Sequence, residues 1–340
     1  NGAENYKIFL NNIQQRLDKI DNQLGNERKI YLELSQYIKE NDTTFDLKYL
    51  FQSDLELRPK ENHLSHEVLV SIKEGMMLLN RITPPSRENN LTKFIDKFYE
   101  RYESREMPLS KVLDVETGLG YLQNVGEGDV NPLLDDLLLP QIENPFKEST
   151  IESNIVLEIL ERKLIECDHT GARKMSLEEA DFKDLAIKWD DLPDTISTMV
   201  EIINDDKKEK IMLSGFSGSS AANLIARFCH GDRKLQEFAN KITDLEKEMN
   251  PDKILAEIIH LPEARVGNIL MRPVFREYEV PYLAKSGLSS VNQIPVDDLY
   301  VSIKNGRLIL RSKKLNKEIL PRLTNAHNFS NNSLPIYHFL

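Results

Sequence analysis

The chain has 340 residues, 40% of them apolar and 29% charged, which is typical of a globular protein with two domains or one domain with appendages. No apolar run approaches the roughly 20 residues that a membrane-spanning helix needs, and residues 1–7 lack the features of a signal peptide. We therefore expect a cytoplasmic protein without a transmembrane segment. The lack of an initiator methionine indicates an excised or processed chain.

The net charge of −11 is unevenly distributed, because residues 251–340 carry +4 and the remainder carries −15. An acidic chain is a poor general ligand for nucleic acid, whose phosphates are bound by Lys and Arg. Only a local basic face near the C-terminal end could bind it. Cys167 and Cys229 have no metal-ligand or disulfide spacing, so we expect two buried thiols in a reducing compartment.

The first hundred residues show the three- and four-residue apolar spacing of amphipathic helices. We predict a helix that ends at Gly25 and a second over residues 27–39. Ser65 is the predicted N-cap of a helix that Pro84-Pro85 interrupts, and Asn90 is the predicted N-cap of the next. These apolar stripes are interpreted as core packing.

The middle of the chain begins with a glycine-containing, loop-rich stretch over residues 107–139, and long irregular segments are often functional. A helix is expected over about residues 151–165. Ser176-Leu-Glu-Glu179 has the spacing of a capping box for a short helix that Pro193 prevents from continuing.

The last part of the chain is richer in β-forming residues. The Gly215–Ser220 segment predicts a turn leading into a helix through Phe228, and Asp232 is a predicted N-cap. Asn305-Gly306 predicts a β-hairpin. The expected strands are residues 196–203, 210–213, 254–259, 299–303 and 307–310.

These elements predict an α+β fold, in which a helical N-terminal part precedes a mixed α/β region with short strands and at least one β-hairpin. We assign residues 1–105 to a mainly helical region and residues 106–195 to a loop-rich and helical connector. Residues 196–340 form the mixed α/β part.

Gly215–Ser220 has the composition of a phosphate-binding loop, but a Walker motif requires Lys followed by Ser or Thr, and Ala221 follows instead. We interpret it as a strand-to-helix turn. His63 and His66 are three residues apart with no third ligand in view, so a zinc site is not expected.

An arginine-rich segment contains Arg265, Arg272 and Arg276. Arginine binds carboxylate or phosphate through two parallel hydrogen bonds, so the segment could hold an acidic substrate group or an RNA backbone. The alternative is a set of internal salt bridges. The acidic partners expected for these bridges are Glu263, Glu277 and Glu279.

Asp114 stands in Leu113-Asp-Val-Glu-Thr-Gly-Leu-Gly-Tyr121. A carboxylate beside a glycine-rich turn either caps the turn or takes part in acid–base chemistry. The residues alone favour capping.

An ordered series of short motifs over roughly residues 45–340 resembles the N-terminal, glutamylating part of class I lantibiotic dehydratases. The motifs are Phe51–Leu55, Phe98–Tyr102, Met107–Leu109, Leu113-Asp114 with Gly118–Tyr121, Leu192-Pro193, Ala222–Phe228, Ala256–Pro262, Arg265 with Gly267-Asn268, Arg272-Pro273, Tyr278–Tyr282, Leu310–Ser312, Pro321-Arg322, Ala326–Asn328 and Tyr337–Leu340.

The resemblance implies that a Ser or Thr hydroxyl of a lantibiotic precursor peptide attacks the ester of glutamyl-tRNA, and that a separate site later eliminates glutamate. No cofactor other than this co-substrate is implied. Asp114 matches the Asp of the family's Asp-x-x-x-Gly-x-Gly-Tyr motif, and Arg265 matches its Arg-x-Gly-Asn motif, so we expect catalytic roles for both. The residues expected to bind substrate or tRNA are Arg227, Arg272, Arg276 and His327.

Members of the family are longer than this chain, which we therefore expect to be an internal fragment that is inactive alone. Its expected partners are the precursor peptide, glutamyl-tRNA, and the remainder of the dehydratase or a cyclase. The alternative is a non-catalytic scaffold module that binds a peptide or a partner protein.

Overall fold

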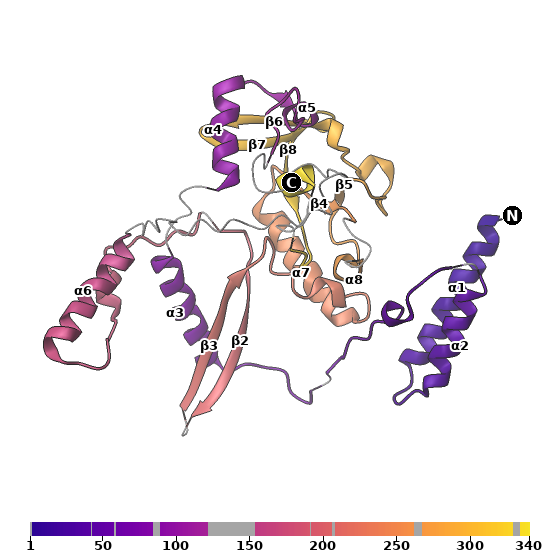
Figure 1. Ribbon diagram of the computed structural model, residues 1–340, viewed down its shortest axis with the longest axis horizontal. Helices are drawn as coiled ribbons and strands as arrows, with labels where there is room; N and C mark the ends of the chain where they lie inside the picture. The colour runs from indigo at the N-terminus through magenta and orange to yellow at the C-terminus, as the bar shows by residue number, and fades with distance from the viewer. Residues whose placement is uncertain are drawn as a thin grey trace, which may run out of the picture. The chain divides into compact units, whose positions relative to one another are not determined.

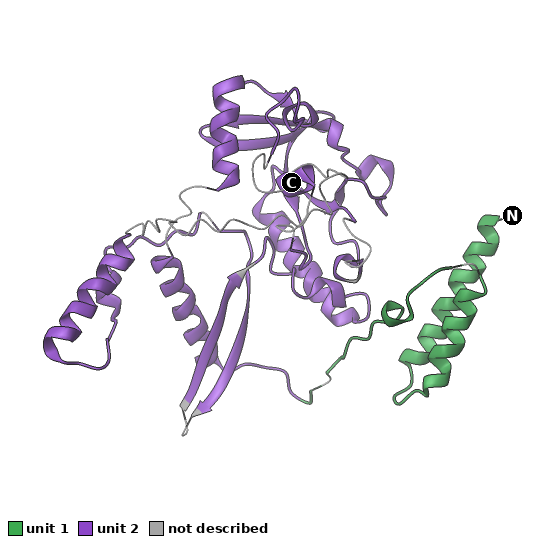
Figure 2. Ribbon diagram, in the orientation of Figure 1, with its two compact units in different colours: residues 1–60 green, residues 61–340 purple. Residues whose placement is uncertain are grey.

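The structure is a computed structural model, and it describes residues 2–41, 43–57, 59–83, 89–121, 154–190, 192–205, 208–261, 267–328 and 334–340. The chain forms two compact units, residues 1–60 and residues 61–340 (Figure 2). Among the described residues, no helix is long and apolar enough to cross a membrane.

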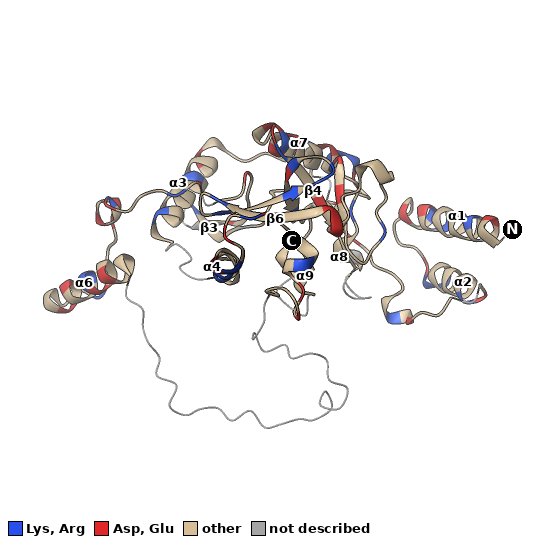
Figure 3. Cartoon of the chain, turned by 90° about the horizontal axis from the view of Figure 1, so that it is seen from above, with Lys and Arg blue, Asp and Glu red and all other residues tan. Residues whose placement is uncertain are grey.

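The first unit is a pair of helices, α1 (Gly2–Asp21) and α2 (Arg28–Lys39), followed by the 3-10 helix η1 (Leu47–Tyr49). Acidic and basic side chains are interspersed along α1 (Figure 3). Both predicted helices are confirmed, although α1 ends before Gly25, which has a φ of +75° in the connecting turn. The buried side chains between the helices are Phe9, Ile20, Leu34 and Ile38.

The second unit opens with helices whose ends are fixed by side-chain caps. Ser65 accepts a hydrogen bond from Val68 N (3.2 Å) at the start of α3 (His66–Ile82), as predicted. The N-cap of α4 (Asn90–Tyr102) is Asn89, not Asn90, because Asn89 forms a reciprocal capping box with Thr92. Pro84 and Pro85 lie outside the described residues.

The helix expected over residues 151–165 is α6 (Ile155–Thr170), with Asn154 as its N-cap and Gly171 in the left-handed conformation after it. The capping box expected at Ser176–Glu179 is wrong. Glu178 and Asp181 form the box instead, at the 3-10 helix η2 (Glu179–Phe182).

The expectation that both cysteine thiols are buried is correct for Cys229 and wrong for Cys167, which is partly exposed.

A long antiparallel hairpin consists of β2 (Ser197–Asp205) and β3 (Lys208–Ser217). The helix expected after it, through Phe228, is wrong, because only the 3-10 helix η3 (Ala226–Phe228) forms there. Ser220 Oγ accepts a hydrogen bond from Ala222 N (3.2 Å), and this local bond favours a run of turns over a regular helix.

The larger sheet is mixed and has the strand order β1-β6-β7-β8-β4-β5 (Figure 1). Its strands are β1 (Met107–Pro108), β4 (Ile254–Ile259), β5 (Tyr278–Pro281), β6 (Leu299–Lys304), β7 (Arg307–Ser312) and β8 (Lys317–Arg322). The predicted Asn305-Gly306 hairpin joins β6 to β7, with both turn residues at positive φ. Strands β8, β4 and β5 are parallel, so their carboxyl ends lie at one edge of the sheet.

Helices cover this sheet. Figure 3 shows α4 on one side of the strands and α7 (Arg233–Met249) on the other. The main core lies between the sheet, α4, and the short helices α5 (Leu109–Val112) and α9 (Pro335–Phe339). Phe98 of α4 and Val301 of β6 are fully buried, and each contributes about 1.5–3 kcal/mol by leaving water. The α+β fold predicted from the sequence is confirmed.

Candidate functional site

The Asp114 segment is a tight turn that directly follows α5. Asp114 Oδ1 accepts hydrogen bonds from Thr117 N (2.6 Å), Thr117 Oγ1 (2.9 Å) and Glu116 N (3.0 Å). These bonds, those from Thr117 foremost, hold the pKa of the carboxyl below its ordinary value. Asp114 is therefore ionised at neutral pH, and because all three bonds go to Oδ1, the carboxylate caps the turn through one oxygen only.

Glycine is required inside this turn. A Cβ on Gly118 would lie 2.2 Å from Lys111 O and 2.4 Å from Val112 O, which no side chain can tolerate. Arg101 of α4 fastens the same turn, because its guanidinium donates to Gly118 O (2.6 Å) and Thr117 O (2.9 Å). The backbone around Asp114 is therefore held from both sides.

A second group of polar side chains lies at the carboxyl edge of the parallel strands. His260 directly follows β4, Tyr282 follows β5 and His327 follows β8. Tyr337 of α9 joins them, because its ring centroid lies 4.5 Å from that of His260 and its hydroxyl lies 3.0 Å from His327 Nδ1. Burial raises the pKa of Tyr337 to about 12, so this hydroxyl stays protonated. The carboxyl edge of parallel strands is where open α/β sheets bind ligands.

His260 has a defined tautomer in its neutral form. Its Nδ1 lies 2.8 Å from the Tyr282 carbonyl oxygen, which can only accept, so Nδ1 carries the proton. The other ring nitrogen, Nε2, is buried and has no hydrogen-bond partner among the described residues.

Arg272 and Arg276, in the crossover from β4 to β5, share one buried carboxylate. Arg272 Nη2 lies 2.7 Å from Glu257 Oε1, and Arg276 Nε lies 3.2 Å from Glu257 Oε2. Arg276 Nη2 also lies 2.5 Å from Oε2 of Glu246, a fully buried residue of α7. Thr324, after β8, donates to both oxygens of Glu257, at 2.6 Å and 2.8 Å. The network therefore joins β4, α7 and the end of β8.

The alternative expectation, that these arginines form internal salt bridges, is correct for Arg272 and Arg276. The acidic partners differ from those expected. Glu277 pairs with Lys247 (3.0 Å), Glu279 accepts a hydrogen bond from Ser286, and Glu263 lies outside the described residues. Glu257 is an acidic residue in an otherwise apolar strand, and that contrast is the sequence signal that could have identified it.

The other predicted site residues are distributed more widely. Arg265 lies outside the described residues. Arg227 is on η3, where its guanidinium lies 4.5 Å from the centre of the Phe228 ring, and η3 contacts α8 (Gly267–Leu270). Of the six predicted residues, the structure brings Arg272 and Arg276 together, and it places His327 beside Tyr337.

The Asp114 turn and the polar group at the strand ends are linked through α9. Tyr121, which ends the Asp114 motif, has its ring centroid 5.3 Å from that of Phe339. Tyr337 is two residues earlier on the same helix and contacts His260 and His327. His260, Tyr282 and Tyr337 are not predictable as site residues from the sequence, because only the sheet topology brings them together.

Comparison with known proteins gives the family. A family model described as lantibiotic dehydratase, N terminus, matches residues 5–340. The chain belongs to this family. The family predicted from the ordered motifs is therefore confirmed.

The chain also matches solved structures, and the first of them is similar in fold. The tRNA-dependent lantibiotic dehydratase MibB from Microbispora sp. 107891 is 19% identical with a TM-score of 0.67, over 95% of this chain and 31% of that one. The glutamylation domain of TbtB, from thiomuracin biosynthesis, is 13% identical with a TM-score of 0.42, over 81% of this chain and 34% of that one. TbtB has also been solved with bound 5'-phosphodesmethylglutamycin. No curated protein matches the chain. The chain thus spans about a third of the length of these relatives.

Proposed function

We propose that this chain is part of a dehydratase that transfers glutamate from glutamyl-tRNA to Ser and Thr residues of a lantibiotic precursor peptide. The observation that carries the proposal is the family match over residues 5–340. The rigid, glycine-dependent turn around Asp114, at the position of the family's motif, supports it.

In the proposed reaction, the Ser or Thr hydroxyl oxygen attacks the carbonyl carbon of the glutamyl ester. The bond from that carbon to the ribose oxygen breaks, and the hydroxyl proton passes to the ribose oxygen. Such a step needs a group that orients the hydroxyl and cations that stabilise the negative charge developing on the carbonyl oxygen. The tRNA is a co-substrate, and the proposal requires no other cofactor.

Asp114 is the proposed orienting group. Its lowered pKa makes it a weak base, so its contribution is a fixed negative charge beside the reacting atoms. Arg265 is the proposed ligand of an anionic substrate group, and Arg227 and His327 are proposed substrate or tRNA contacts. Arg272 and Arg276 are bound to buried carboxylates, which favours a supporting role for them beneath the strand ends.

A non-catalytic scaffold is the competing function, and in it the Asp114 carboxylate would only cap the turn. The substitution Asp114→Asn separates the two, because the amide oxygen can still cap the turn while the charge is lost. In the complete natural form of the protein, we expect Asp114→Asn to slow transfer of labelled glutamate from glutamyl-tRNA by about 100-fold, the effect of removing one electrostatic group from an acyl-transfer site. A folded Asp114→Asn variant that transfers glutamate at the wild-type rate would exclude Asp114 from the chemistry.

The proposal also requires parts beyond this chain, which spans 31% of MibB. We therefore expect the isolated 340-residue chain to transfer no glutamate. Robust transfer by the isolated chain would contradict this expectation.

A further inference from the structure

The turn between β7 and β8 concentrates positive charge on an acidic chain. Residues 297–322 contain seven Lys and Arg against three Asp and Glu, a local charge of +4, although the whole chain carries −11. Lys313, Lys314 and Lys317 are all exposed at this turn. Clustered exposed lysines create a local positive potential that survives an unfavourable net charge.

The turn is also rigid. Asp298 holds it, because its Oδ1 accepts from Lys314 N (2.9 Å), its Oδ2 accepts from Ser312 Oγ, and its carbonyl accepts from Lys313 N (3.0 Å). Ser312 Oγ in turn accepts from Leu315 N (3.1 Å). Both carboxylate oxygens of Asp298 are thus engaged in the turn, and the lysines project from a fixed backbone.

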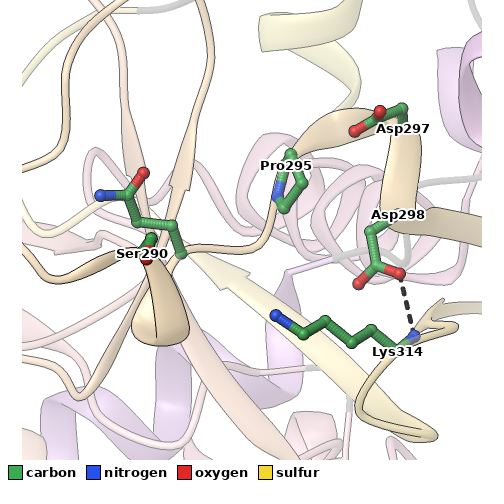
Figure 4. Close-up of a pocket in the computed structure, with 6 residues that line it drawn as sticks. Ser290, Pro295, Asp297, Asp298 and Lys314 are labelled. Atoms are coloured by element: carbon green, nitrogen blue, oxygen red, sulfur yellow. Dashed lines mark hydrogen bonds between the residues drawn. The ribbon is translucent and has the colours of Figure 1, made fainter.

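An aromatic ring and an open hollow adjoin the turn. The Nζ of Lys313 lies 5.0 Å from the centre of the Tyr300 ring, so an aromatic face lies beside the cation. Lys314 borders an open hollow of about 450 Å³, and Figure 4 shows its side chain extending toward Ser290. The residues that line the hollow are Ser290, Gln293, Pro295, Asp297, Asp298 and Lys314.

The turn lies close to the Asp114 segment. Asp298 belongs to the 3-10 helix η5 (Val296–Asp298), and η5 contacts α5. Asp114 follows α5 after a single residue. The lysine turn and the proposed acyl-transfer site are therefore joined through η5 and α5, within reach of one long ligand.

We propose that the β7–β8 turn, through Lys313, Lys314 and Lys317, binds the sugar-phosphate backbone of the RNA that carries the glutamyl group. The inference rests on the proposed function. RNA fits better than an acidic peptide, because a phosphate backbone presents closely spaced charges to a rigid lysine cluster. Among the described residues, the hollow beside the turn is lined by polar side chains and Pro295, unlike the apolar grooves that bind peptides.

The test is binding of unacylated tRNA to the complete natural form of the protein as a function of salt concentration. Each lost phosphate contact lowers the slope of log affinity against log salt by about one, so K313A/K314A/K317A should reduce the slope by about two to three. At 0.1 M salt, we expect affinity to fall by about tenfold or more. The control K183A/K234A/K241A removes three exposed lysines elsewhere in the second unit, and it should leave both quantities unchanged.

The outcomes separate this inference from the proposed function. Unchanged tRNA binding by K313A/K314A/K317A, with normal binding by the wild type, would overturn the lysine surface and leave the function standing. Absence of tRNA binding and of glutamyl transfer in the wild type would refute the function itself. Loss of precursor-peptide binding with retained tRNA binding would assign the surface to an acidic peptide and would also overturn the inference. A melting temperature equal to that of the wild type shows that the variant is folded.

Discussion

Arg276 has little contact with water, and its guanidinium neutralises two buried carboxylates. Its side chain is 3% exposed, and those of Glu246 and Glu257 are 0% and 4% exposed. In Arg276→Met, Glu257 keeps Arg272 and Thr324. Among the described residues, the Glu246 carboxylate then keeps only the hydrogen bond from Thr195 Oγ1 and loses its cation. An uncompensated buried charge of this kind costs about 3–5 kcal/mol.

The cost should appear as a lower denaturation midpoint in urea, followed by far-ultraviolet circular dichroism, and as a melting temperature lower by on the order of 10 °C. Arg307→Met makes the same chemical change at an exposed position of β7, and it should alter the free energy of unfolding by no more than about 0.5 kcal/mol. The double variant Glu246→Gln/Arg276→Met removes the stranded charge as well, so it should be more stable than Arg276→Met alone. A free energy of unfolding of Arg276→Met within about 1 kcal/mol of the wild-type value would contradict a stranded charge on Glu246. A double variant less stable than Arg276→Met would contradict it as well.

Two further predictions concern the Asp114 turn. Gly118→Ala would place a methyl group 2.2 Å from Lys111 O, so it should destabilise the second unit by about 2 kcal/mol or more. Gly287→Ala adds its methyl group in open space and should cost about 0.5 kcal/mol or less. Urea denaturation of both variants measures the difference. The folded state lowers the pKa of Asp114 below 3.8, so the stabilisation from its ionised form is present above that value and is lost as the pH falls through the lower folded pKa. The stability difference between wild type and Asp114→Asn should therefore shrink as the pH is lowered from 5 toward 2, and a difference that stays constant over this range would contradict the assignment.

The candidate site was partly visible in the sequence. The Asp-x-x-x-Gly-x-Gly-Tyr spacing identified Asp114. The structure shows the turn that this spacing builds, and at position 118 of that turn only glycine fits. The arginine-rich segment was also identified. The ionic partners of this segment were not identified, because Glu246 is 30 residues from Arg276 along the chain. The two residues meet only when α7 packs beside β4.

Sequence alone determined the features that depend on near neighbours. Ser65 and Asp232 cap helices through residues two or three positions later, and Asn305-Gly306 closes its hairpin because both residues tolerate positive φ. The helix expected through Phe228 failed for the same local reason, since hydrogen bonds within the turns displaced it.

Only the tertiary structure decided which distant residues meet. Parallel pairing of β8, β4 and β5 places His260, Tyr282 and His327 at one edge, although they are separated by up to 67 residues along the chain. Neither periodicity nor turn chemistry encodes that pairing, because it depends on burying the apolar faces of the strands and helices together in one core. The elements are thus local properties of the chain, and the site is a property of their packing.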